Sequence, residues 1–224
     1  MGPEVSFNAV TKSYSSPDGV RNTVLDNVDL SIPAGAFLRL DGPSGSGKST
    51  ILNLIAGLFL PDKGTISVGN KEITSFSESE RDTFRSENIG YVFQTFNLLS
   101  PLTVMENLTI PSILANRKES KSKTEIEKLL TKFGIFDQRK KKPFQLSVGQ
   151  RQRVAIIRAI LNKPKILLSD EPTANLDLAS AKIVIDSMLE LKESGVTLIV
   201  ATHDPSFAKL SSDMVYNVEK GELI

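Results

Sequence analysis

The stretch from residue 42 to residue 50 limits the folds open to this chain more than any other. It has the spacing Gly-x-x-x-x-Gly-Lys-Ser. Residues 36–40 before it are mostly apolar, as in a strand, and residues 51–56 after it have the apolar content of a helix. A glycine-rich turn between a strand and a helix predicts that a phosphate group binds at the helix N-terminus.

Each residue type in this loop suits a phosphate site. Glycine lets the backbone turn so tightly that successive N–H groups point into one concavity, and the helix end adds a partial positive charge. The Lys48 ammonium can reach the outer phosphates, and the Ser49 hydroxyl can bind Mg²⁺. A glycine-rich turn without a ligand is disfavoured because Lys and Ser both stand in place. The expected phosphate-binding residues are Gly42, Pro43, Ser44, Gly45, Ser46, Gly47, Lys48, Ser49 and Thr50.

Composition excludes several other kinds of site. The chain has 224 residues and 40% hydrophobic content, enough for the core of one large domain or two small lobes. It has no cysteine, which excludes disulfides, thiolate metal sites and a cysteine nucleophile. The net charge is +1 and the one basic run, residues 139–142, is short. Because nucleic-acid binding works through clustered Lys and Arg, we expect no nucleic-acid partner.

The sequence predicts a soluble protein that stays in the cytoplasm. The most apolar stretch, residues 51–60, is about half as long as the ~20 residues that a membrane-spanning helix needs. Residues 1–5 lack the basic and then apolar pattern of a signal peptide.

Short apolar runs predict antiparallel strands near both ends of the chain. Residues 5–10 pair with residues 24–32 in one expected hairpin, residues 64–73 form a second, and residues 214–224 form a third. Tyr14 lies at the end of the first arm of the first hairpin. Its ring can stack on a flat base such as adenine or pack within the sheet, and its position alone favours neither.

The middle of the chain predicts a lobe of helices inserted into the sheet domain. Residues 77–85 have the pattern of a short polar helix, and residues 104–116 and 124–133 have the pattern of two longer ones. The last of these is expected to begin with a capping box formed by Thr124 and Glu127.

Gln94 directly follows a predicted strand, residues 89–93. Open α/β sheets bind ligands at the C-terminal ends of their strands, where this amide can reach a metal ion or an attacking water molecule. An isolated surface glutamine usually has neither role. The apolar stretch that follows, residues 95–105, forms either a local core or a surface that docks another protein.

A second helix N-terminus is expected at Ser147, the predicted N-cap of a helix that continues to about residue 161. Its free N–H groups offer a second anion site, and the alternative is an ordinary capped helix.

Two carboxylates end an apolar strand, residues 165–169, whose composition indicates burial on both faces in a parallel sheet. Asp170 and Glu171 should point to opposite sides of the strand end. This favours separate roles, with Asp170 holding Mg²⁺ through its water shell and Glu171 deprotonating the attacking water. The next strand, residues 196–202, ends at His203, the single histidine, which is either structural or part of the same site.

In this order, the motifs resemble the nucleotide-binding domain of an ABC transporter. The resemblance rests on the phosphate loop, Gln94, residues 146–150, residues 170–171, residues 175–177 and His203, and it covers essentially the whole chain. The segments around Gln94 and His203 are most similar to the ATPases of the MacB and LolD group.

The resemblance implies an α/β fold in which residues 1–224 form a single ABC ATPase domain. A P-loop NTPase core with a mostly parallel sheet would carry two additions. One is an N-terminal antiparallel β subdomain of residues 1–35 and 64–75, and the other is an inserted α-helical subdomain of residues 96–160.

The resemblance also implies that two copies pair head to tail with ATP between them. Each ATP would lie between the phosphate loop of one copy and Ser147, Gly149 and Gln150 of the other. Tyr14 becomes the platform for adenine and Glu171 the general base.

Further roles follow from the same resemblance. Asp177 would cross the dimer interface, and His203 would sense the γ-phosphate. The residues expected to take part in catalysis are Glu171, His203 and Lys48, and those expected to hold Mg²⁺ are Ser49, Gln94 and Asp170.

The implied function is the ATP-hydrolysing subunit of a transport complex, in which ATP-driven dimerisation powers export or extraction by a separate membrane subunit. That subunit, of the MacB, LolC or LolE kind, would dock around residues 94–105 and hold the protein on the cytoplasmic face of the membrane. An FtsE-like regulator of a membrane partner is an alternative. A soluble DNA-repair ATPase is disfavoured because residues 50–146 show no sustained heptads.

Val148 departs from the resemblance, because the family's signature has glycine at this position. A β-branched residue is strained if the position requires a positive φ and harmless if it is extended or helical. We expect an active ATPase because Ser147 and Gly149 are retained.

Overall fold

The structure is a computed structural model that describes residues 4–115, 119–174, 176–204, 207, 212–219 and 222–223. Some sequence predictions fall partly outside these residues. They concern Asn175 of the 175–177 motif, residue 116 at the end of the helix expected over residues 104–116, Pro205 in the segment around His203, and residues 220, 221 and 224 of the C-terminal hairpin.

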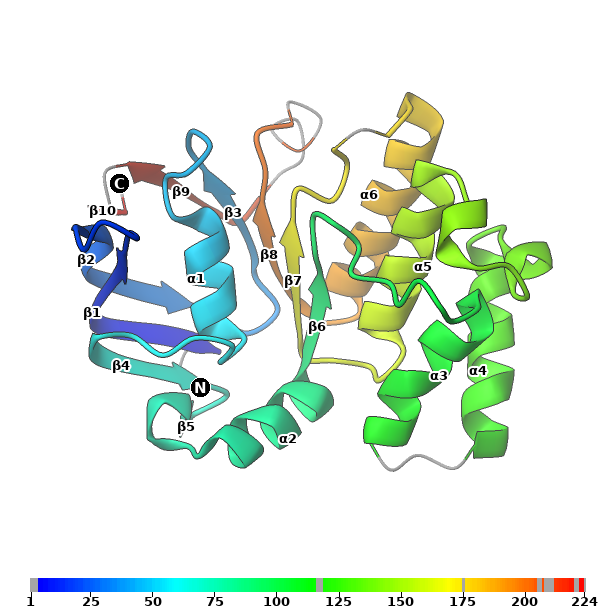
Figure 1. Cartoon of the computed structure of the whole chain (residues 1–224), viewed down its shortest axis with the longest axis horizontal. Helices are drawn as coiled ribbons and strands as arrows, with labels where there is room; N and C mark the ends of the chain where they lie inside the picture. Colours follow the sequence, from blue (N-terminus) through cyan, green and yellow to red (C-terminus); the bar gives the residue numbers. More distant parts are fainter. Residues whose placement is uncertain are drawn as a thin grey trace.

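A four-stranded antiparallel sheet in the order β2-β1-β4-β5 forms one side of the molecule (Figure 1). Its strands are β1 (Val5–Ser15), β2 (Arg21–Ile32), β4 (Lys63–Val68) and β5 (Lys71–Glu72). The first two pair antiparallel, as do β4 and β5, so both N-terminal hairpins are confirmed. Register shifts after Phe7, Val10 and Lys12 interrupt the pairing of β1 with β2, which continues to the last pair, Ser15 with Arg21.

A second sheet of six strands has the order β10-β9-β3-β8-β7-β6. It consists of β3 (Phe37–Asp41), β6 (Ile89–Val92), β7 (Ile166–Asp170), β8 (Thr197–Ala201), β9 (Met214–Glu219) and β10 (Glu222–Leu223). All neighbours pair parallel except β9 with β10. The C-terminal hairpin is confirmed, but β9 also pairs parallel with β3, which the hairpin pattern did not predict.

Both faces of the parallel strands are buried, because apolar residues fill successive positions and alternate between the faces. Leu38, Leu40 and Ile166 belong to a core shared with the antiparallel sheet and the first helix. Phe37 and Leu167 belong to a second core on the helical side. This arrangement confirms the predicted α/β fold of the P-loop NTPase type, with a mostly parallel sheet.

Within the described residues, six α-helices cover the sheets. They are α1 (Lys48–Ile55), α2 (Glu78–Asn88), α3 (Val104–Leu114), α4 (Glu119–Lys132), α5 (Val148–Ile160) and α6 (Leu178–Glu193). Figure 1 shows α1 between the two sheets and α5 and α6 on the other side of the parallel strands, with α3 and α4 beyond them. In the part of the chain that the structure describes, no helix is long and apolar enough to cross a bilayer.

The predicted capping box at Thr124 is wrong, because Thr124 lies within α4. A capping box starts α3 instead, where the Thr103 N–H donates to Glu106 Oε2 at 2.7 Å and the Glu106 N–H donates to Thr103 Oγ1 at 3.3 Å. The division of residues 1–224 into one domain with a β lobe and a helical lobe stays a prediction.

Candidate functional site

The phosphate loop connects β3 to α1 and turns on glycines with positive φ. Gly42 has φ 135°, Gly45 has φ 79°, and Gly47, the N-cap of α1, has φ 113°. A side chain at Gly42 is also excluded by packing, since its Cβ would lie 2.5 Å from the carbonyl oxygen of Val218 in β9. The C-terminal hairpin therefore supports the loop from behind.

Lys48, the first residue of α1, folds back over this loop. Its ammonium donates to the carbonyl oxygens of Gly42 at 2.7 Å and Pro43 at 2.8 Å, and the residue is only 7% exposed. The neighbouring Ser49 is exposed. The loop thus places one buried cation and one accessible hydroxyl at the start of α1.

Asp170, the last residue of β7, lies beside these two groups. The pKa of Asp170 is raised above its ordinary value, chiefly by burial and also by the neighbouring Glu171 carboxylate, while the Ser49 hydroxyl and the Lys48 ammonium partly offset the rise. The structure therefore brings together the phosphate loop and the carboxylate pair, which are more than 100 residues apart in the sequence.

Glu171 leaves the strand in the left-handed region, with φ 48°. Its Oε1 lies 2.6 Å from Nδ1 of His203, and its Oε2 accepts from the Thr202 hydroxyl at 3.1 Å and from the His203 N–H at 3.4 Å. The carboxylate is thus held by the residues that follow β8. The position of the Glu171 side chain therefore depends on this backbone turn as well as on the alternation of side chains along the strand, which the sequence predicts.

Thr202 belongs to the candidate site through its contact with Glu171, and the sequence analysis missed it. It directly precedes His203, and its hydroxyl also accepts from the Asp204 N–H at 3.0 Å. Its position at a strand end next to His203 was a usable signal, but its contact with Glu171 depends on the pairing of β7 with β8.

Ser147 is the N-cap of α5, as predicted. Its hydroxyl accepts from the Gln150 N–H at 3.2 Å, and Gln150 Oε1 accepts from the Ser147 N–H at 3.0 Å. Val148 is the first residue of the helix and is not among the residues with positive φ, so it is unstrained there. The following glycine is constrained, because a Cβ at Gly149 would lie 2.7 Å from Ser180 Oγ.

We expect Gly149→Ala to lower the free energy of unfolding by about 1–3 kcal/mol through overpacking. Ser180 cannot easily yield, since its hydroxyl donates to Asp177 at 2.9 Å and accepts from Arg153 at 3.3 Å. Thermal unfolding measures this, at roughly 2–4 °C per kcal/mol for a chain of this length. Val148→Ala is the matched control and should stay within about 0.5 kcal/mol of the parent. A Gly149→Ala variant as stable as the parent would show that the two helix ends are not in close contact.

Asp177 caps α6 through the Ser180 N–H at 2.9 Å. Hydrogen bonds from the Ser180 backbone and side chain lower the pKa of this exposed carboxylate. The N-termini of α5 and α6 therefore lie together, joined through Ser180. Gln152 adds a buried link, donating to the Pro172 carbonyl at 2.7 Å just after Glu171.

Tyr14 lies next to the start of α1. Its hydroxyl is 3.5 Å from Thr50 Oγ1, and its ring is 5.5 Å from the Lys12 ammonium and packs edge-on against Phe59. The residue is 38% exposed, so the ring has a free surface near the phosphate loop. Gln94 lies two residues after β6 and is exposed, and the described residues give it no hydrogen bond to Ser49 or Asp170.

Comparison with known proteins assigns the family. Residues 25–174 match the family model described as ABC transporter. An uncharacterised ABC transporter ATP-binding protein of Mycobacterium tuberculosis, MT1014, is 44% identical over 91% of this chain and 82% of its own length. The LolD lipoprotein-releasing ATP-binding protein of Idiomarina loihiensis is 39% identical over 89% and 88%.

A solved structure agrees with these relatives. The ATP-binding cassette MJ0796, solved as a dimer in a post-hydrolysis state with ADP and Pi, superimposes with a TM-score of 0.92 at 36% identity, covering 98% of this chain and 96% of that one. This chain is therefore an ATP-binding protein and ATPase, and it belongs to the ABC transporter family.

Proposed function

We propose that this chain is the ATP-hydrolysing subunit of a membrane transport complex of the MacB and LolD group, working as a homodimer. The observation that carries the proposal is the position of the half-buried carboxylate pair at the end of β7 beside Lys48 and Ser49, with Glu171 oriented by Thr202 and His203. The similarity to LolD and to a cassette solved as a dimer supports it.

In this proposal Glu171 is the general base. It accepts a proton from the attacking water while the water oxygen bonds to the γ-phosphorus and the bond to the ADP oxygen breaks. Thr202 and His203 fix the carboxylate for this step, so less orientational entropy is lost when the reaction occurs. Lys48 stabilises the negative charge on the outer phosphates, and His203, 77% exposed in its side chain, faces outward where the γ-phosphate would lie.

The residues around Asp170 fit a Mg²⁺ ion. Mg²⁺ prefers hard oxygen ligands and keeps several waters, and the Ser49 hydroxyl and the Asp170 carboxylate supply such oxygens side by side. Gln94 is the third proposed ligand. A Mg²⁺ ion held by these residues would neutralise part of the negative charge on the phosphates.

The second half of each ATP site comes from the other copy. Ser147, Gly149 and Gln150 present the N-terminus of α5, whose partial positive charge favours an anion. Asp177 lies at the adjoining end of α6 and would contact the partner copy. Tyr14 supplies the stacking surface for adenine.

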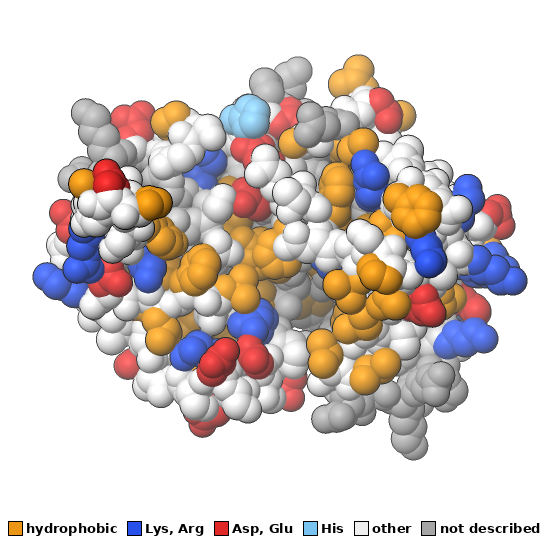
Figure 2. All heavy atoms as spheres, in the orientation of Figure 1, with side chains coloured by type: hydrophobic (Ala, Val, Ile, Leu, Met, Phe, Trp, Pro, Cys, Tyr) orange, Lys and Arg blue, Asp and Glu red, His pale blue; other side chains and the backbone are white. Residues whose placement is uncertain are grey.

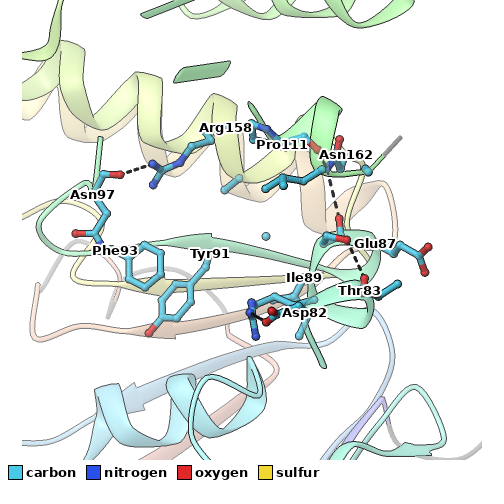
Figure 3. Close-up of a pocket in the computed structure, with 16 residues that line it drawn as sticks. Asp82, Thr83, Glu87, Ile89, Tyr91, Phe93, Asn97, Pro111, Arg158 and Asn162 are labelled. Atoms are coloured by element: carbon cyan, nitrogen blue, oxygen red, sulfur yellow. Dashed lines mark hydrogen bonds and ion pairs between the residues drawn. The ribbon is translucent and has the colours of Figure 1, made fainter. Parts of the chain in front are cut away.

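The surface around residues 94–105 is the proposed docking site for the membrane subunit. A cavity of about 650 Å³ lies beside this stretch, which contributes Asn97 to its lining, and most of the lining comes from α2, β6, α3 and α5 (Figure 3). Figure 2 shows hydrophobic side chains on both sides of a hollow in the middle of this face. Leu99 is 50% exposed, Ile113 64% and Leu114 69%, so apolar surface is available for a partner helix.

We expect the double change Ile113→Glu and Leu114→Glu to release the chain from membranes that contain its permease. Two charges in an apolar contact would leave the carboxylates desolvated and unpaired. The measurement is the share of the chain that sediments with membranes of its native cell. The matched control is Val215→Glu on β9, an exposed apolar residue outside the cavity, which should sediment like the parent. Equal sedimentation of all three would remove this surface as the docking site.

A further inference from the structure

Arg158 of α5 reaches across the cavity to the loop that follows Gln94. Its guanidinium donates through one terminal nitrogen to the Phe96 carbonyl at 2.7 Å and through the other to the Asn97 carbonyl (Figure 3). This is a two-point contact of a planar cation with two successive backbone oxygens, which fixes orientation as well as distance.

The loop held in this way has an unusual backbone. Phe96 has φ 62° and Asn97 has φ 47°, so two successive non-glycine residues adopt the left-handed conformation. That region is sparsely populated, above all for a bulky residue such as phenylalanine, and it persists only where surrounding contacts impose it. The Arg158 contacts are the interactions that draw both carbonyls toward the helix.

Burying the positive charge of Arg158 at this position costs free energy. Arg158 is half-buried, and burial lowers the pKa of its guanidinium. Its partners at this point are neutral carbonyls, which compensate a buried charge less well than a carboxylate does. Without Arg158 the loop would lose both hydrogen bonds. The stabilisation that offsets the backbone strain of the left-handed Phe96 and Asn97 would then be lost.

Neighbouring positions on the same face of α5 make similar contacts. The Arg151 guanidinium lies 5.6 Å from the centre of the Phe96 ring. Asn162, just after the helix, donates to the Pro111 carbonyl of α3 at 3.0 Å and to the Ser86 carbonyl of α2 at 3.4 Å. One side of α5 therefore binds the backbone of three segments that line the cavity.

We infer that Arg158 is a positioning residue that fastens the Phe96–Asn97 turn to α5. The loop that follows Gln94 and the Ser147 end of the helix then move as one rigid body. Arg158 lies eleven positions after Ser147 along the helix, a span of about 16 Å at ~1.5 Å per residue. This inference rests on the proposed function, which takes the cavity as the docking site of the permease. If the permease docks there, its occupancy of the cavity and the presentation of Ser147 to ATP are linked mechanically.

The absence of cysteine from the chain allows a direct test. Spin labels at Ser100→Cys in the loop and Lys163→Cys after α5 report the distance between the two elements by pulsed electron resonance. A pair at Lys163→Cys and Lys182→Cys on α6 is the matched control, because all three positions are exposed and this pair leaves out the loop. We expect one narrow distance peak for the parent, and the same peak after ATP is added in the Glu171→Gln background.

Arg158→Gln should at least double the width of the loop-to-helix peak and leave the control peak unchanged. Arg158→Lys keeps the charge but cannot bridge both carbonyls, so its peak should be of intermediate width. Unchanged widths in Arg158→Gln overturn the inference, and so does a parent peak that shifts with ATP. If Arg158→Gln broadens the control peak as well as the loop-to-helix peak, the variant has lost its fold. Arg158→Lys then decides, by whether it broadens the loop-to-helix peak and leaves the control peak unchanged.

The peak widths without ATP require neither nucleotide nor permease. An unchanged width therefore overturns the role of Arg158 and leaves the proposed function intact. A parent chain that fails to hydrolyse ATP would overturn the proposed function and leave the loop result standing.

Discussion

Replacement of Glu171 by glutamine will lower the rate of ATP hydrolysis by about 10² to 10⁴-fold and leave ATP binding in place. Glutamine has nearly the same shape and can still accept from the Thr202 hydroxyl, but its amide cannot take the proton of the attacking water. Phosphate release measures the rate, and titration calorimetry measures the affinity for ATP.

Glu193→Gln is the matched control for this change. Glu193 is the exposed last residue of α6, outside the site, and its replacement should leave hydrolysis at the parent rate. Equal rates in Glu171→Gln and the parent would remove Glu171 as the base. Loss of ATP binding in Glu171→Gln would show instead that the carboxylate supports the nucleotide site structurally.

Replacement of Lys48 by alanine will weaken ATP binding by about 10 to 100-fold. The Lys48 ammonium donates to the carbonyl oxygens of Gly42 and Pro43, which hold it over the loop. When ATP binds, the same N–H groups can donate to phosphate oxygens instead. A hydrogen bond to a charged group contributes about 1.5–3 kcal/mol, and each 1.4 kcal/mol is a factor of about ten in affinity.

Lys182→Ala on α6 is the matched lysine control, because its partner is Asp186 on the same exposed helix face. Its ATP affinity should equal that of the parent. If Lys48→Ala also binds ATP as tightly as the parent, the loop at residues 42–50 does not hold the outer phosphates.

Local patterns in the sequence were enough to predict much of this site. The phosphate loop, the N-cap at Ser147 and the strand that ends at Asp170 each depend on neighbouring residues, and the structure has all three. The harmless placement of Val148 also follows from local geometry, since the first position of a helix tolerates a β-branched residue.

Long-range pairing explains what the sequence did not predict. The seating of Gly42 against Val218 depends on β9 joining β3, and the contact of Thr202 with Glu171 depends on β7 lying beside β8. The two carbonyl contacts of Arg158 likewise join residues 61 and 62 positions apart. A capping pattern alone was misleading at Thr124, because α4 continues N-terminal to it.

We propose that one chain holds only half of each ATP site, so that ATP brings two chains together. Light scattering measures the mass of the Glu171→Gln variant in solution with and without ATP. We expect about 24.5 kDa without nucleotide and about twice that mass with ATP and Mg²⁺. A variant that binds ATP and remains at the mass of a single chain would contradict it.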